Sequence, residues 1–174
     1  MNSNTSSGTF AYAAAAFFVT GMALAISQAP PMTFSGPPPA MSVIVALAFT
    51  FFHLSLLPVV AAMDAPGWAK GSGYAWIAMD NVIVFMGYFG VAENLVIPMR
   101  LGIHLACGTW IIGASLAAVG AERLIGSLAA LALVAVSFAG PFIGAEHVGP
   151  ALGPSGLLLV TWLLMVGTRL NRAV

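Results

Sequence analysis

Charge is what this sequence has least of. Only 6 % of its 174 residues are charged, while 60 % are hydrophobic. A soluble domain usually carries about a quarter charged residues, so this chain lacks the solvated groups needed to cover a surface in water. The mean hydropathy of +1.01 agrees with that deficit. We therefore expect a membrane protein whose partner over most of its surface is the lipid bilayer.

Basic runs are also absent, and the formal net charge is zero, so the sequence gives no reason to expect a nucleic-acid partner. The single cysteine, Cys107, excludes an internal disulfide and a thiolate cluster, and its apolar surroundings favour a buried thiol. Glycine-rich cofactor motifs are missing too, and Lys70 falls in a predicted loop, which excludes a retinal Schiff base. The sequence predicts no cofactor.

Long apolar runs, in contrast, are abundant. A helix rises about 1.5 Å per residue, so a hydrocarbon layer of roughly 30 Å needs about twenty apolar residues. The runs lack the alternation of barrel strands, and only helices or closed barrels cross lipid. The first run lacks the basic region of a signal peptide, so we expect it to stay as a helix. We predict an all-α bundle of six transmembrane helices in a single domain, residues 1–174, with spans near 9–29, 41–62, 74–97, 101–119, 124–143 and 151–169.

Glycine and proline mark the connections between these runs. The segment APPMTFSGPPPA (29–40) indicates a stiff extended link, and DAPGWAKGSG (64–73) indicates a polar loop. Pro98 disfavours helix at the residue before it, which predicts a tight turn at 98–100. A short turn is expected at 120–123, and a longer loop at 140–154 that carries Glu146 and His147.

The basic residues predict an orientation. If the N-terminus is inside, the inner loops hold Lys70, Arg123, Arg169 and Arg172, whereas the outer loops hold only Arg100. Because cytoplasmic loops carry the excess of lysine and arginine, we expect both termini in the cytoplasm. A bacterial inner membrane is the expected location.

Polar residues within the spans are predicted to form two layers. On these boundaries Asp80 lies roughly 9 Å above the inner end of its helix and Glu93 roughly 6 Å below the outer end. Packing of the second span on the third would let His53 meet Asp80, and the turn at Pro98 would bring Arg100 to Glu93 as an ion pair. The inner layer is His53, Asp80 and Asn81, and the outer layer is Glu93, Asn94, Arg100, His104, Glu146 and His147.

Ionisable groups within a span cost about 2.5–3.5 kcal/mol at the centre and often mark a site. The candidate catalytic residues are Asp80, Glu93, His53 and His104, and the candidate substrate-binding residues are Asn81, Asn94, Arg100, Trp110, Tyr88, Glu146 and His147. Structural roles stay open for each of them: a buried acid can fix helix packing, a serine, threonine or carbonyl can satisfy His53, and Trp110 can be ordinary core. Trp68 and Trp76 suit an interfacial belt.

The histidines and carboxylates suggest two metal-based alternatives. A bis-histidine haem would use His53 and His104, but their predicted depths differ by roughly 10 Å, too far for one iron. A zinc or iron site could draw on His104, His147, Glu146 and Glu93, but no diagnostic spacing supports it. The sequence therefore predicts no metal.

Three functions fit these patterns. In an enzyme for a small lipophilic substrate, burial would keep a carboxyl group neutral and able to protonate an alkene, epoxide or carbonyl, so isomerisation or cyclisation needs no cofactor. A small-molecule transporter or membrane substrate-binding subunit is the second, and since such proteins often dimerise, a homo-oligomer stays open. The third is a non-catalytic subunit of a membrane complex.

Overall fold

A computed structural model describes residues 3–27, 40–89 and 91–172, and in these ranges the chain forms six helices and no strand. The all-α class predicted from the apolar runs is therefore confirmed. The helices are α1 (Ser3–Ser27), α2 (Ala40–Ala62), α3 (Gly67–Tyr88), α4 (Glu93–Ala117), α5 (Gly120–Ile143) and α6 (Ala145–Arg172).

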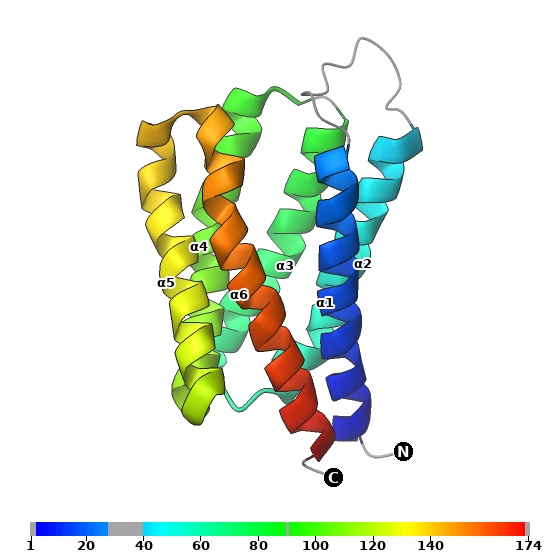
Figure 1. Cartoon of the computed structure of the whole chain (residues 1–174), viewed down its shortest axis with the longest axis vertical. Helices are drawn as coiled ribbons and strands as arrows, with labels where there is room; N and C mark the ends of the chain where they lie inside the picture. The colour runs from blue at the N-terminus through cyan, green and yellow to red at the C-terminus, as the bar shows by residue number, and fades with distance from the viewer. Residues whose placement is uncertain (1–2, 28–39, 90, 173–174) are drawn as a thin grey trace.

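The helices form a closed ring in chain order. Each packs mainly against its neighbours in sequence, and α6 returns to pack against α1 (Figure 1). Both ends of the chain lie at the same end of the bundle, which we call the terminal end. The ring surrounds a core that draws on all six helices.

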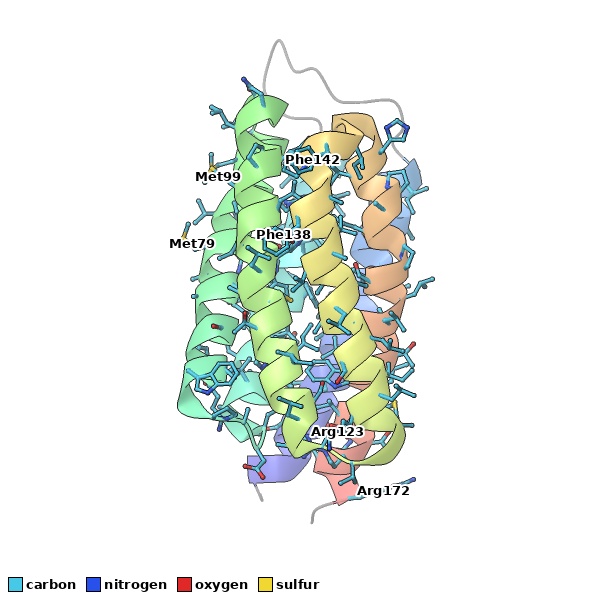
Figure 2. The ribbon with its side chains drawn as sticks, turned by 90° about the vertical axis from the view of Figure 1, so that its left-hand side faces the viewer. Met79, Met99, Arg123, Phe138, Phe142 and Arg172 are labelled. Atoms are coloured by element: carbon cyan, nitrogen blue, oxygen red, sulfur yellow. The ribbon has the colours of Figure 1, made fainter. Side chains whose placement is uncertain are left out.

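Five of the six helices are long and apolar enough to cross a membrane, namely α1, α2, α4, α5 and α6. Large apolar side chains also cover the outside of the bundle, as Met79, Met99, Phe138 and Phe142 illustrate (Figure 2). Since water does not favour such a surface, it indicates contact with lipid. The sixth helix, α3, is not among these five, because Lys70, Asp80 and several small residues lower its hydropathy.

Helix boundaries differ from the prediction around residues 88–100. The third helix ends at Tyr88 instead of 97, and α4 begins at Glu93 instead of 101. Pro98 is thus inside α4 and the predicted turn at 98–100 is wrong. Pro98 is the sixth residue of α4, so its missing N–H removes one intrahelical hydrogen bond, and the helix nevertheless continues through it.

The predicted loop at 140–154 is also wrong. Gly144 alone separates α5 from α6, and its φ of 83° is a conformation that side-chain-bearing residues rarely adopt. Pro141 lies inside α5, whereas Pro150 and Pro154 lie inside α6. The loop at 64–73 is shorter than predicted because α3 begins at Gly67, and the turn at 120–123 moves to residues 118–119. The link at 29–40 lies almost wholly outside the described residues.

The helices pack closely at the terminal end. Gly8 of α1 and Gly167 of α6 face each other so closely that a Cβ on either would meet the other's backbone oxygen. The Tyr12 hydroxyl lies 2.9 Å from the Thr168 hydroxyl across the same interface. Arg169 donates from Nε to both carboxylate oxygens of Glu122, at 3.1 and 3.0 Å, and so ties α6 to α5. Close packing by small residues of this kind is typical of membrane helices.

Candidate functional site

A chain of aromatic rings crosses the bundle and supports the site from below. Trp76 stacks on Trp110 with ring centroids 5.8 Å apart, and Trp110 meets Trp162 edge to face at 5.4 Å. In the other direction Phe52 lies 5.9 Å from Trp76 and 5.0 Å from Phe18. Edge-to-face and offset contacts at these spacings are favourable. Residues from α1, α2, α3, α4 and α6 thus form one rigid floor.

A polar cluster lies above this floor, where α2, α3 and α4 meet. His53 Nε2 lies 3.1 Å from Oδ2 of Asp80, and Arg100 Nε lies 3.5 Å from Oδ1 of the same carboxylate. His104 follows Arg100 by four residues on the same face of α4 and is near enough to interact electrostatically with Asp80 and Arg100. The structure therefore brings the predicted His53–Asp80 contact together and adds two groups from α4.

The two predicted polar layers are, in this region, one layer. Asp80 lies about 12 Å below the end of α3 at Tyr88, and Arg100 lies about 10 Å below the start of α4 at Glu93. The prediction separated them because it extended the third helix to residue 97 and started the fourth at 101. Moving the connection back to residues 89–92 lowers Arg100 and His104 to the depth of Asp80.

Asp80 lies between two basic side chains, His53 on α2 and Arg100 on α4. The His53 ring is fully buried and is packed between Phe52 and Trp76, at centroid distances of 4.8 and 5.1 Å. His53 and Asp80 are therefore fixed in place, whereas Arg100 is less constrained. The contact of Arg100 Nε with Asp80 is longer than a good charge-assisted hydrogen bond, and among the described residues Nε has no hydrogen-bond partner. The Nε2 atom of His53 also lacks a hydrogen bond of good geometry.

A cavity of about 570 Å³ lies beside this cluster. That volume is within the range of small-molecule pockets, about 300–1,000 Å³. Its walls are mostly apolar, and all six helices contribute. The lining residues with polar side-chain atoms are Asp80, Arg100, His104, Trp76, Cys107 and Ser155. The Ser155 hydroxyl is already used, because it donates to the Leu152 carbonyl at 2.7 Å. The polar chemistry of the cavity is thus concentrated on the α3–α4 wall.

Other predicted site residues lie away from this wall. Asn81 donates from its side chain to the Ile77 carbonyl at 3.0 Å, a contact within its own helix. Asn94 is exposed in the first turn of α4, and His147 is exposed in the first turn of α6. Trp110 is fully buried in the aromatic floor and does not line the cavity. The Tyr88, Glu93 and Glu146 side chains lie outside the described residues, while the expected partner of Glu93, Arg100, contacts Asp80 instead.

Two cavity residues were missed or misplaced by sequence reasoning. Trp76, predicted to lie in an interfacial belt, is buried and lines the cavity. Cys107, predicted only to be a buried thiol, lines the cavity as well. The signal was helical spacing: Trp76 precedes Asp80 by four residues, and Arg100, His104 and Cys107 follow one another at intervals of four and three.

The depth argument against a bis-histidine haem is wrong, because His53 and His104 both lie beside Asp80. However, His53 points Nε2 at Asp80. The side chains of Glu93 and Glu146, two of the four ligands weighed for zinc or iron, lie outside the described residues. Among the residues that were placed, no group of three or more His, Cys, Asp or Glu side chains could hold a metal ion.

The chain was also compared with known proteins. No protein-family model, curated protein or solved structure matched it. Function therefore has to be inferred from the chemistry of the cavity and of the cluster on its wall.

Proposed function

We propose that this protein is a membrane-embedded enzyme that acts on a small lipophilic substrate by acid–base chemistry, of the isomerase or cyclase type. One observation carries the proposal: the cavity is apolar except for one wall, where a carboxylate, a guanidinium and an imidazole converge. Pockets that combine apolar walls with a few convergent ionisable groups are the usual form of small-molecule sites. An apolar substrate body would fill the cavity and place its reactive end against this wall.

His104 is the best candidate for proton transfer. It lines the cavity, and its Nδ1 is buried without a hydrogen-bond partner among the described residues. In a double-bond isomerisation it would remove a proton from one carbon and return a proton to another, so no net proton is gained or lost. Arg100 would stabilise negative charge on a substrate oxygen during the transfer. Asp80 and His53 would act as positioning residues that hold Arg100 in place.

The proposed setting is a bacterial inner membrane with all six helices crossing it and both termini in the cytoplasm. Met79, Val82 and Phe85 expose apolar side chains on α3, which supports a sixth span despite its lower hydropathy. Lys70, Arg123, Arg169 and Arg172 lie within four residues of helix ends at the terminal end, and Figure 2 shows Arg123 and Arg172 there. Because Arg100 lines the cavity within α4 and is not at a helix end, the basic excess at the terminal end supports a cytoplasmic location.

Deuterium incorporation tests the enzyme without knowledge of the substrate. The purified protein would be incubated with a total lipid extract in D₂O, and mass spectrometry would search for a lipid that gains deuterium at carbon. We expect such a lipid with the wild type and with His147→Ala, which removes an exposed imidazole that does not line the cavity. His104→Ala should abolish the exchange while circular dichroism shows a folded protein. Equal exchange in His104→Ala would contradict the proposed role.

A transporter or substrate-binding subunit is the second candidate, because the cavity reaches exposed residues on α1 and α6. It predicts uptake of a solute into proteoliposomes that depends on Arg100, without any deuterium exchange. A non-catalytic subunit predicts that changes at the cluster affect only assembly. A homo-oligomer is compatible with all three and is tested by the mass of the purified protein in detergent.

A further inference from the structure

We propose that the cavity opens sideways into the bilayer between α1 and α6, and that its ligand is a chain-bearing amphiphile whose head group is an oxygen acceptor. This inference rests on the proposed function in that both need a ligand in the cavity. It goes further by assigning the route and the chemical class of the ligand. Two independent features support it: the distribution of exposure along the cavity lining, and the divergence of α1 from α6.

Exposure along the lining shows where the cavity meets the outside. The lining residues of α2, α3, α4 and α5 are buried or half-buried. In contrast, Val19 and Ile26 on α1 are 52 % and 71 % exposed, and Leu157 on α6 is 74 % exposed. These three apolar side chains lie on the outer surface, where we expect lipid. The cavity therefore reaches the surface on the α1–α6 side.

The arrangement of the two helices explains the opening. Near the terminal end α1 and α6 are held together by the Gly8–Gly167 approach and the Tyr12–Thr168 contact. Toward the opposite end they separate, and Figure 1 shows the C-terminal end of α1 well apart from the N-terminal end of α6. The lining residues on these helices run from Phe18 to Ile26 on α1 and from Gly149 to Val160 on α6. The two helices still meet within these ranges, because a Cβ on Gly156 would contact the ring of Phe18.

Two glycines on the α6 side of the opening carry no side chains. Nothing lies within 4 Å of a Cβ built on Gly149 or Gly153, although both residues line the cavity. A Cβ at Gly153 would therefore enter open space without displacing a neighbour. This makes Gly153 a suitable position for a substitution that narrows the opening.

The polar wall defines the head group. Arg100 is a cation whose Nε lies 3.5 Å from Asp80 without a hydrogen bond, and the indole N–H of Trp76 is buried without an acceptor. Both are donors, so the matching group on the ligand is an acceptor, such as a carboxyl, ester or ketone oxygen. The remaining lining is apolar and continues to the lipid-facing surface. A hydrocarbon chain would follow that path with its head at Arg100.

Cys107 provides a natural reporter of the opening, since it is the chain's single cysteine, is 1 % exposed and lines the cavity. The protein in liposomes would be treated with an alkyl-chain maleimide or with a charged, membrane-impermeant maleimide. We expect the alkyl reagent to label Cys107 much faster than the charged reagent. Gly153→Trp should slow alkyl labelling by at least about tenfold, the effect of roughly 1.4 kcal/mol on access. The matched control is Gly102→Trp on α4, where a Cβ also meets nothing within 4 Å and the residue does not line the cavity.

Head-group selectivity is read from protection in the same assay. Tetradecanoic acid or its methyl ester should protect Cys107, whereas tetradecane at the same membrane fraction should not. The inference is overturned if both maleimides label equally, if Gly153→Trp labels like Gly102→Trp, or if tetradecane protects as well as the acid. Labelling requires only access to Cys107, so His147→Ala, which changes an exposed residue that does not line the cavity, should label like the wild type. If deuterium exchange fails while Gly153→Trp still slows the labelling of Cys107, the proposed enzyme activity is rejected and the proposed lateral opening is retained.

Discussion

The two ends of the helix ring are built differently. At the terminal end, small residues let helices touch, and Glu122 and Arg169 form a well-aligned ion pair. Away from it, α1 and α6 separate, a cavity of about 570 Å³ appears, and the ion pair of Asp80 and Arg100 is longer and lacks a hydrogen bond. One end holds the bundle together, while the other leaves donors available to a ligand. Function is thus expected where packing is least complete.

The largest expected effect is on the rate of deuterium exchange and concerns the end of the bundle that holds the cavity. His104→Ala should lower deuterium exchange by about 10²–10⁴-fold, the usual contribution of a general acid or base. His147→Ala should leave the rate unchanged, since His147 does not line the cavity. Mass-spectrometric exchange rates at equal protein concentration provide the comparison. A small, similar effect of both variants would remove the functional difference between the two histidines.

Asp80→Asn should lower stability by about 2–3 kcal/mol. It leaves the Arg100 cation without its counter-charge, and the loss is below the 3–5 kcal/mol of fully buried pairs because Arg100 is partly exposed. Unfolding in mixed micelles, followed by circular dichroism, measures the change. The double variant Asp80→Asn/Arg100→Gln should recover part of the stability, whereas strictly additive losses would show that the two groups do not interact.

Two glycine substitutions compare packing at the two ends. Gly126→Leu should destabilise by about 1–3 kcal/mol, because even a Cβ there would meet Ser115 Oγ and Trp162. Gly153→Leu should cost less, since its Cβ meets nothing within 4 Å. The same unfolding assay applies to both variants. Equal destabilisation would mean that the α1–α6 opening is packed as tightly as the terminal end.

The smallest expected effect is at the contact between Tyr12 of α1 and Thr168 of α6. Thr168→Val removes the hydroxyl that lies 2.9 Å from Tyr12 and should cost about 0.5–1.5 kcal/mol. If α1 and α6 are held together there, labelling of Cys107 should become slightly faster in the same variant. Slower labelling would argue against a clamp that limits the opening.

Sequence reasoning predicted the fold class because hydropathy depends only on local composition. It also anticipated the contact of His53 with Asp80, since a short link makes α2 and α3 neighbours. It failed at Pro98, which was interpreted as a helix breaker although it lies inside α4, six residues into the helix. That one error displaced Arg100 and His104 by several residues in depth and split one cluster into two layers.

The cavity could not be predicted because it depends on how helices diverge. Nothing local distinguishes the half of α1 that packs on α6 from the half that separates from it. Trp76 shows the same limit: an indole near a helix end is typical of a membrane interface, and only the stacking on Trp110 shows that it faces the interior. Tertiary packing, not residue type, decides these placements.

The most direct test is mass spectrometry of the organic extract from protein purified in mild detergent. The matched variant is Cys107→Phe, which places a larger apolar side chain in the cavity wall. We predict a non-phospholipid, acceptor-headed amphiphile in near-stoichiometric amount from the wild type, and a strong reduction in the variant. Bulk phospholipid alone, with the same profile from both proteins, would contradict a ligand-binding cavity.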